Sequence, residues 1–197
     1  MTVKFYHNPQ SRAAMTHWLL EELGIDYEIM PVAYEDGSMR SPEFLAINPM
    51  GKIPAIVDGD TIVTETTAIA IYLADKYKSP NDLAPAIDDK RRGEYLRWVA
   101  FQSASIDPAM MQANTKVEIP RRAAGWGSVE LVMDVLDARL SKAEPYLLGE
   151  WFTAADVLIG GALSWATQFG MFEMRPGFET YLKAIQSRPA FQKAMTG

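Results

Sequence analysis

The hydrophobic pattern of the chain changes once, near residue 80, and this change limits the folds that it can adopt. Before it, short apolar runs alternate with amphipathic segments, so strands and helices follow one another. After about residue 88, only helical periodicity recurs. With 197 residues, 48% of them hydrophobic, the chain can bury one large core or two smaller ones. The pattern predicts an α/β domain over 1–78, a linker over 79–87 and an all-helical domain over 88–197.

In the first domain, the sequence predicts the order strand, helix, strand, loop, strand, strand, helix. VKFYH, residues 3–7, is typical of a strand, and an amphipathic helix is expected over 11–23. DYEIMPV, residues 26–32, is expected to run parallel to the first strand, because a helix connects the two. PAIVDGDTIVT, residues 54–64, predicts a hairpin around its Asp-Gly pair, and residues 66–78 predict the closing helix.

Composition excludes several classes of function. The net charge of −6 argues against a nucleic-acid-binding surface, which needs a basic face. No cysteine is present, so a disulfide, a thiolate metal site and a thiol nucleophile supplied by the protein are all excluded. His7 and His17 form no metal-binding pattern, and we expect no metal. No segment resembles a signal peptide or has the ~18 apolar residues that span a bilayer, which predicts a cytoplasmic protein without a membrane partner.

Three motifs, taken in their order, connect the chain to a family. They are NPMGKIPAIVDGD at 48–60, TETTAIAIYLADKY at 64–77 and FTAADVLIG at 152–160. The third carries Thr153 and Asp156 at the spacing of a helix capping box. In this order, and over essentially its whole length, the chain resembles the cytosolic glutathione transferases. We place it with bacterial, cysteine-free members of the theta/beta-like kind. The resemblance implies a thioredoxin-like N-terminal domain and an all-α C-terminal domain.

The resemblance also implies how glutathione is bound as co-substrate. In the family, the proline that matches Pro54 is cis, and the residue before it, here Ile53, turns its backbone toward the cysteinyl unit. Thr66 matches the residue that binds the γ-glutamyl carboxylate, next to the free N–H groups of a helix start. Glu65 is expected to pair with the γ-glutamyl ammonium. Plain helix capping by Thr66 is the alternative.

The glycine end of glutathione is where this chain departs from the family pattern. Lys52 is placed to bind the glycine carboxylate, although a solvated lysine is an equal alternative. Many relatives carry a histidine or arginine upstream of their PEFL motif, and Met39 stands where the histidine would be. Arg40, the next residue, is expected to replace it.

The stretch YHNPQSRAAM, residues 6–15, is expected to hold the glutathione thiolate at a helix N-terminus. Lowering a thiol pKa by two units requires ~2.7 kcal/mol, and a helix terminus supplies only ~0.3–1 kcal/mol. One side-chain donor adds ~1.5–3 kcal/mol and completes the requirement. Depending on the family pattern used for the alignment, the catalytic position falls on Asn8 or on Ser11, and both remain open. Tyr6 is expected to be a core residue.

These expectations lead to one function and two alternatives. The favoured function is a glutathione S-transferase, in which the activated thiolate attacks a small hydrophobic electrophile. The alternatives are another glutathione-dependent reaction, such as peroxide reduction or isomerisation, and a non-catalytic glutathione-binding or interaction module. The family implies a homodimer and a role in detoxification. Residues at helical spacing in the second domain are expected to contribute to the electrophile pocket: Trp98, Phe101, Ser105 and Trp165.

Overall fold

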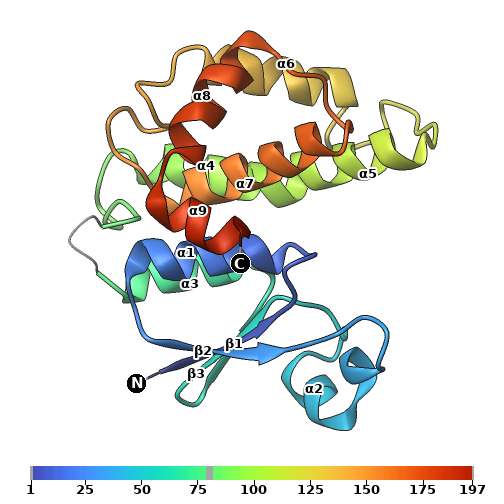
Figure 1. Cartoon of the computed structure of the whole chain (residues 1–197). Coiled ribbons are helices and arrows are strands. Elements are labelled where there is room, and N and C mark those ends of the chain that lie inside the picture. The colour runs from blue at the N-terminus through green and yellow to red at the C-terminus, as the bar shows by residue number, and fades with distance from the viewer. Residues whose placement is uncertain (1, 79–81, 197) are drawn as a thin grey trace. The chain divides into compact units, whose positions relative to one another are not determined.

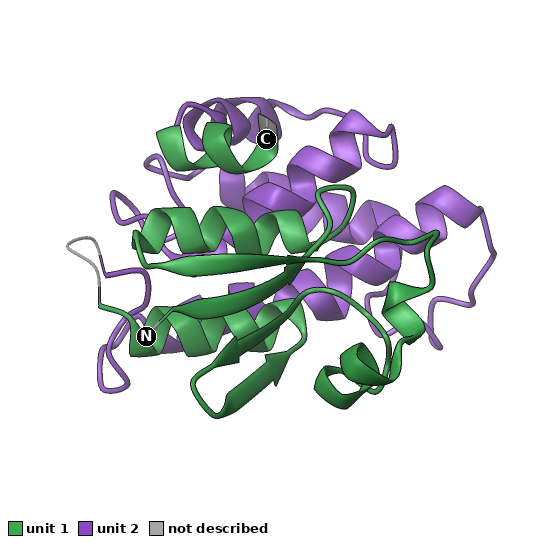
Figure 2. Cartoon of the chain, turned by 60° about the horizontal axis from the view of Figure 1, so that its bottom comes forward, with its two compact units in different colours: residues 1–81, 189–197 green, residues 82–188 purple. Residues whose placement is uncertain are grey.

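The computed structural model describes residues 2–78 and 82–196. The chain divides into two compact units (Figure 2): unit 1 comprises residues 1–81 and 189–197, and unit 2 comprises 82–188. The C-terminal segment thus belongs with unit 1, whereas the sequence places it in the helical domain. Of the linker expected at 79–87, residues 79–81 lie outside the described residues and the remainder groups with unit 2.

Unit 1 is built on a four-stranded sheet in the order β2-β1-β3-β4. Its strands are β1 (Val3–His7), β2 (Tyr27–Pro31), β3 (Ala55–Asp58) and β4 (Thr61–Thr64). As the sequence predicts, β1 and β2 are parallel, and β3 and β4 form an antiparallel hairpin. β3 also pairs with β1 in the antiparallel sense, so β1 lies inside the sheet between β2 and β3.

Helices α1 (Ala13–Leu23) and α3 (Thr66–Lys76) lie together on one side of this sheet (Figure 1). Successive side chains of β1 point to opposite faces of the sheet, so α1 and α3 cover only every second one. Phe5 is fully buried beside His17 of α1, with the ring centroids 6.1 Å apart. Tyr6 points the other way and packs against Phe44, with the ring centroids 5.4 Å apart. The two faces of β1 thereby contribute to two separate apolar clusters.

Short helices occupy the segment that the sequence leaves irregular between β2 and β3. They are η1 (Ser38–Arg40) and α2 (Pro42–Ile47). Ser41 caps α2 by accepting a hydrogen bond from the Phe44 N–H at 3.2 Å, and Pro42 is the first helical residue. With so few residues, α2 has no amphipathic period to read, and capping and packing decide its conformation.

The last helix, α9 (Pro189–Thr196), packs on α1 within unit 1. The Trp18 and Phe191 rings meet edge to face with centroids 4.9 Å apart, and Trp18 is fully buried. At the other end of this contact, Lys193 Nζ lies 2.7 Å from a carboxylate oxygen of Glu21. This packing explains why the C-terminal segment groups with unit 1.

A buried carboxylate joins the β3–β4 hairpin to the end of α3. Asp58 is 3% exposed, and one of its oxygens, Oδ2, accepts hydrogen bonds from three groups. The donors are the Tyr72 hydroxyl at 3.0 Å, Lys76 Nζ at 2.7 Å and the Tyr77 hydroxyl at 2.8 Å. Because the charge is paired and hydrogen-bonded, its burial is tolerated.

Unit 2 is helical in its regular structure. Its helices are α4 (Arg92–Phe101), α5 (Asp107–Thr115), α6 (Val129–Leu140), α7 (Ala154–Gln168) and α8 (Pro176–Gln186). Between α4 and α5 the chain continues as a π-helical turn, η2 (Gln102–Ile106). In the described parts of the chain, no helix combines the length and apolar character that crossing a bilayer requires.

The predicted capping box begins α7. The Thr153 N–H donates to Asp156 Oδ2 at 2.9 Å, and the Thr153 hydroxyl donates to the same oxygen at 3.0 Å. Asp156 Oδ1 accepts from the Leu147 N–H at 2.8 Å and from the Tyr181 hydroxyl at 3.0 Å. Burial raises the pKa of Asp156 to about 6. This side chain therefore connects α7, α8 and the segment before α7.

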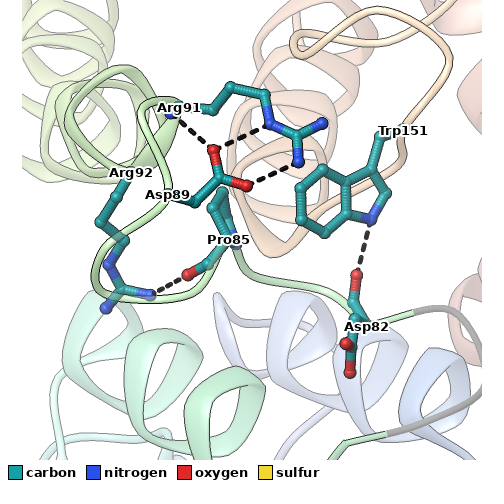
Figure 3. A network of polar contacts seen from close by, with 6 residues as sticks. All are labelled: Asp82, Pro85, Asp89, Arg91, Arg92 and Trp151. Atoms are coloured by element: carbon teal, nitrogen blue, oxygen red, sulfur yellow. Dashed lines mark hydrogen bonds and ion pairs between the residues drawn. The ribbon is translucent and has the colours of Figure 1, made fainter.

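A polar network fixes the first residues of unit 2 (Figure 3). Asp89 accepts two hydrogen bonds from the Arg91 guanidinium, at 3.0 and 2.6 Å, and this pairing lowers the pKa of Asp89 to about 2. The Arg91 guanidinium lies over the Trp151 ring, 4.4 Å from its centroid. The indole N–H of Trp151 donates to the Asp82 carbonyl at 2.7 Å. The segment 82–91 is thereby held against the chain that leads into α7.

Candidate functional site

The sheet register brings three of the predicted stretches together at one end of unit 1. Ala55, the first residue of β3, pairs with Tyr6 on one side and with Thr64 on the other. Continuing this register places Ile53–Pro54 beside the chain that leaves β1 and beside Glu65–Thr66. The loop after β1, the start of β3 and the start of α3 therefore meet at the same edge.

The middle of this edge is formed by Ile53 and Pro54, whose peptide bond is cis. Pro54 is buried, and the half-buried Ile53 packs against the cluster of Val32, Phe44 and Ala55. No described residue forms a backbone hydrogen bond with the Ile53 N–H. This N–H, two residues before β3, can therefore take an extended ligand as its partner.

Glu65 has an unusual backbone conformation, with φ of 69° and ψ of 120°. Positive φ is rare for a residue with a Cβ atom and costs of the order of 1–3 kcal/mol. Glu65 is the N-cap of α3 but forms no side-chain cap, and Thr66 is the first helical residue. Thr66 is thus not the N-cap that the capping alternative supposes. In the described part of the chain, neither side chain has a hydrogen-bond or ion-pair partner.

Two cations lie next to this edge. Gly51 has φ of 60°, and a methyl group on it would lie 2.7 Å from the Met39 carbonyl oxygen and 3.1 Å from Nη1 of Arg40. The Arg40 guanidinium is therefore folded back over Gly51, beside Lys52 in the chain. Within residues 2–78 and 82–196, neither cation is paired with a carboxylate. In a protein of net charge −6, two unpaired neighbouring cations favour an anionic ligand.

Asn8, one of the two candidate thiolate donors, uses its side chain within the protein. Its Nδ2 donates to the Val32 carbonyl at 3.0 Å, and its Oδ1 accepts from the Gln10 N–H at 2.9 Å. The second arrangement is an Asx-type turn, which Asn forms readily before a proline. The amide therefore has its plane fixed by two backbone groups.

Ser11, the other candidate, lies two residues before α1, next to the N-cap residue Arg12. Its Oγ donates to the Asn8 carbonyl at 2.7 Å and accepts from the Ala13 N–H at 3.0 Å. The Ala14 and Met15 N–H groups bond to the carbonyls of Ser11 and Arg12, both at 3.1 Å. The sequence predicts several free N–H groups at this helix start, and these three are not free. The half-buried Ser11 hydroxyl is left as the adjustable donor there.

Tyr6 has the core role expected for it. Its ring lies 5.4 Å from that of Phe44, on the α2 side of the sheet, and packs in the same cluster as Ile53.

The residues predicted for the electrophile pocket differ in exposure. Trp98 is only 1% exposed and packs edge to face on Phe101, with centroids 5.4 Å apart, which favours a core role for Trp98. Phe101, Ser105 and Trp165 are each partly exposed. Ser105 lies in the π-helical turn, and such turns occur often at functional sites.

Comparison with known proteins gives a consistent family. Residues 1–75 match the family model for the glutathione S-transferase N-terminal domain. The chain is 34% identical to Glutathione S-transferase 3 of Zea mays, and the match covers 98% of this chain and 93% of the maize protein. A glutathione transferase from Methylococcus capsulatus has a TM-score of 0.82 at 29% identity, covering 99% of this chain and 98% of that chain.

A second solved structure is the glutathione transferase URE2P6 from Phanerochaete chrysosporium, in complex with oxidized glutathione. It has a TM-score of 0.84 at 27% identity, covering 99% of this chain and 95% of that chain. These matches confirm the predicted fold class, a thioredoxin-like domain with an all-helical one.

Proposed function

The chain belongs to the glutathione S-transferase family, and on that premise we propose that unit 1 binds glutathione at the strand ends and activates its thiol through Ser11. The chain is a transferase that acts on glutathione. The narrower placement among bacterial, theta/beta-like members stays a prediction, and the maize relative is a plant protein.

The observation that carries this proposal is the set of unpaired charges at one edge of unit 1. Glutathione has two carboxylates and one ammonium group along an extended chain. Arg40 and Lys52 supply cations for the glycine carboxylate, and Thr66 supplies a hydroxyl at a helix start for the γ-glutamyl carboxylate. Glu65 supplies the anion for the ammonium group. The Ile53 N–H, between these ends, faces the cysteinyl backbone.

Ser11 is our choice for the donor because its hydroxyl proton can change partners without moving the oxygen. In the ligand-free chain the proton points at the Asn8 carbonyl, a neutral acceptor. A thiolate is a charged acceptor, and hydrogen bonds to charged groups are worth ~1.5–3 kcal/mol against ~0.5–1.5 kcal/mol for neutral ones. Rotation about the Cβ–Oγ bond therefore favours the sulfur once glutathione is bound.

The reaction then follows from the bound thiolate. The thiol proton passes to solvent, and the sulfur forms a bond to an electrophilic carbon of a small hydrophobic substrate. Where that carbon carries a leaving group, the group departs with the bonding electrons. Phe101, Ser105 and Trp165 are proposed to contact the electrophile, and Trp98 to support them from the core. A homodimer, a cytoplasmic location and a role in detoxification are proposed from the family alone.

The test is a pH titration of the ultraviolet difference spectrum of protein-bound glutathione, which reports the thiolate. We expect an apparent thiol pKa about two units below the free value of ~8.5. The variant Ser11→Ala is expected to return it toward the free value, and Ser11→Thr to retain most of the shift. Saturable binding with an unshifted thiol pKa would overturn thiol activation and leave a glutathione-binding module.

A further inference from the structure

We propose that Asn8 is a positioning residue, which acts on the sulfur only through Ser11. The inference rests on the proposed function, since it concerns how the Ser11 hydroxyl is presented to the thiol. From the sequence, Asn8 is a candidate for donating a hydrogen bond directly to the thiolate, and the positioning role differs from that.

Two hydrogen bonds to Val32, the residue after β2, hold Asn8 and the neighbouring His7. Its Nδ2 donates to the Val32 carbonyl at 3.0 Å, and the Val32 N–H donates to the His7 carbonyl at 2.9 Å. Val32 is 5% exposed and belongs to the apolar cluster below the loop, so its own position is well defined. His7, which ends β1, and Asn8, which follows it, are thus both held by one buried residue.

The side-chain amide of Asn8 cannot rotate toward a ligand without losing hydrogen bonds that it forms within the protein. Its Oδ1 accepts from the Gln10 N–H at 2.9 Å while Nδ2 is bound to Val32. Because the amide is planar, rotating Nδ2 toward a sulfur atom breaks both bonds together. Nδ2 carries a second hydrogen, so a direct contact to the thiolate that keeps the amide in its plane leaves the turn intact, whereas one that rotates the amide dismantles the turn that carries Ser11.

Ser11 depends on this turn through the backbone of Asn8. The Ser11 Oγ lies 2.7 Å from the Asn8 carbonyl oxygen and 3.0 Å from the Ala13 nitrogen. The Asn8 carbonyl and the first helical N–H therefore hold the oxygen between them. When the Ser11 hydroxyl proton turns toward the sulfur, Oγ still accepts the hydrogen bond from the Ala13 N–H. The Asn8 carbonyl oxygen, which remains next to Oγ, still limits the positions that Oγ can occupy. Small displacements of such a donor have large effects, because the hydrogen bond depends steeply on geometry.

The test is a double-mutant cycle on the apparent pKa of protein-bound glutathione, with wild type, Asn8→Ala, Ser11→Ala and the double variant. We expect Asn8→Ala to raise the thiol pKa by about one unit, half of the activation proposed above. In the Ser11→Ala background, Asn8→Ala is expected to cause no further rise in the thiol pKa. An equal rise in both backgrounds, or no rise in wild type, would overturn the inference.

A matched control is available in the same turn. The Gln10 side chain is exposed, and Gln10→Ala leaves its backbone N–H in place, so the thiol pKa is expected to remain that of wild type. Circular dichroism of each variant shows whether unit 1 is folded. Asn8→Asp serves as a second variant for the exchange measurement below, since it keeps an acceptor for the Gln10 N–H and loses the donor to Val32. Its added negative charge itself raises the thiol pKa, so it is left out of the pKa comparison.

A measurement without glutathione separates this inference from the proposed function. Amide hydrogen exchange of the ligand-free chain is expected to be faster at Gln10 and Ala13 in Asn8→Ala, and faster at Ala13 alone in Ser11→Ala. In Asn8→Asp, Ala13 is expected to exchange faster than in wild type. Unchanged exchange at Ala13 in both Asn8 variants would overturn the positioning role. An unshifted thiol pKa in wild type would instead overturn only the proposed activation.

Discussion

Arg40 lies over Gly51, with Nη1 3.1 Å from the point that a methyl group on the glycine would occupy. The Met39 carbonyl oxygen is nearer still, at 2.7 Å. The close approach of the η1 segment to the chain before β3 thus requires a residue without a side chain at position 51. It also keeps the arginine over Gly51, the residue before Lys52 in the chain.

The first prediction follows from this contact. Gly51→Ala adds a methyl group that collides with the Met39 carbonyl and displaces Arg40, so glutathione affinity is expected to fall by about tenfold or more. Stability is expected to fall by about 1–3 kcal/mol, from positive φ and the collision together. Calorimetric titration and chemical denaturation measure the two effects. The control is Gly24→Ala, at a glycine with a similar φ of 61° and with nothing within 4 Å of the added methyl group. A matching loss of affinity in that control would contradict the explanation.

The second prediction concerns the strained backbone of Glu65. Glu65→Gly relieves the positive φ while increasing the freedom of the unfolded chain, so stability is expected to be unchanged or higher by about 1 kcal/mol. Glutathione affinity is expected to fall in the same variant, because the carboxylate is lost. Glu65→Ala keeps the strain and loses the carboxylate, so its affinity is expected to fall equally without a gain in stability. A lower stability of Glu65→Gly than of Glu65→Ala would show that no strain is stored at this position, because only the added freedom of the unfolded chain would then remain.

The third prediction is a pH dependence of stability from His7. Burial, with a contribution from the neighbouring His17, lowers the pKa of His7 from 6.5 to about 4. Between these values the unfolded chain binds more protons than the folded one, so the free energy of unfolding falls as pH falls from 7 to 4. The full loss in the free energy of unfolding is about 3 kcal/mol, because each unit of pKa shift corresponds to ~1.36 kcal/mol.

Chemical denaturation at pH 7, 5.5 and 4.5 measures this dependence. The variant His7→Asn is neutral at every pH and is expected to show a smaller loss of stability on acidification than wild type. Asp156, whose pKa is raised to about 6, acts in the opposite direction, so the difference between the two proteins is the quantity to compare. Parallel curves would exclude His7 as the titrating group.

The fourth prediction concerns the buried carboxylate of Asp58. Asp58→Asn removes the charge that Lys76, Tyr72 and Tyr77 share, and leaves the buried oxygen a weaker acceptor. A loss of about 2–4 kcal/mol is expected on chemical denaturation. Asp60 is exposed in the same hairpin, and Asp60→Asn is expected to change stability by less than ~0.5 kcal/mol. Similar effects of the two substitutions would show that the three donors do not depend on the Asp58 charge.

The fifth prediction separates packing from charge at α9. Phe191→Ala removes the ring that covers Trp18 and is expected to cost about 1–3 kcal/mol, since the ring is half-buried. Lys193→Ala removes a mostly exposed partner of Glu21 and is expected to cost less than ~1 kcal/mol. Thermal unfolding of both variants measures the difference. A larger effect at Lys193 than at Phe191 would reverse this assignment.

Local signals in the sequence were sufficient for much of unit 1 and for the start of α7 in unit 2. The Asp58-Gly59 pair predicts the hairpin that β3 and β4 form, and Gly59 has φ of 61° in its turn. Gly24 ends α1 with positive φ, as its place after an amphipathic run indicates. The capping residues Thr153 and Asp156 mark the start of α7 because both halves of that motif lie within four residues.

Other features depend on contacts between distant segments, which no local pattern reports. The strained φ of Glu65 is imposed where β4 meets α3, and its residue type gives no sign of it. That Asn8 binds the Val32 carbonyl follows from the parallel pairing of β1 with β2, which brings residues 24 positions apart together. α9 joins unit 1 because Trp18 offers it a buried aromatic surface, although its sequence continues the helical half.

The membership of α9 in unit 1 also has a consequence for biosynthesis. A ribosome makes the chain from its N-terminus, so Trp18 leaves the exit tunnel well before the Phe191 ring that covers it. Until then the nascent chain exposes an indole ring that the finished protein buries completely. A premature stop codon that removes α9 would leave unit 2 intact in sequence and deprive the glutathione-binding unit of its last helix.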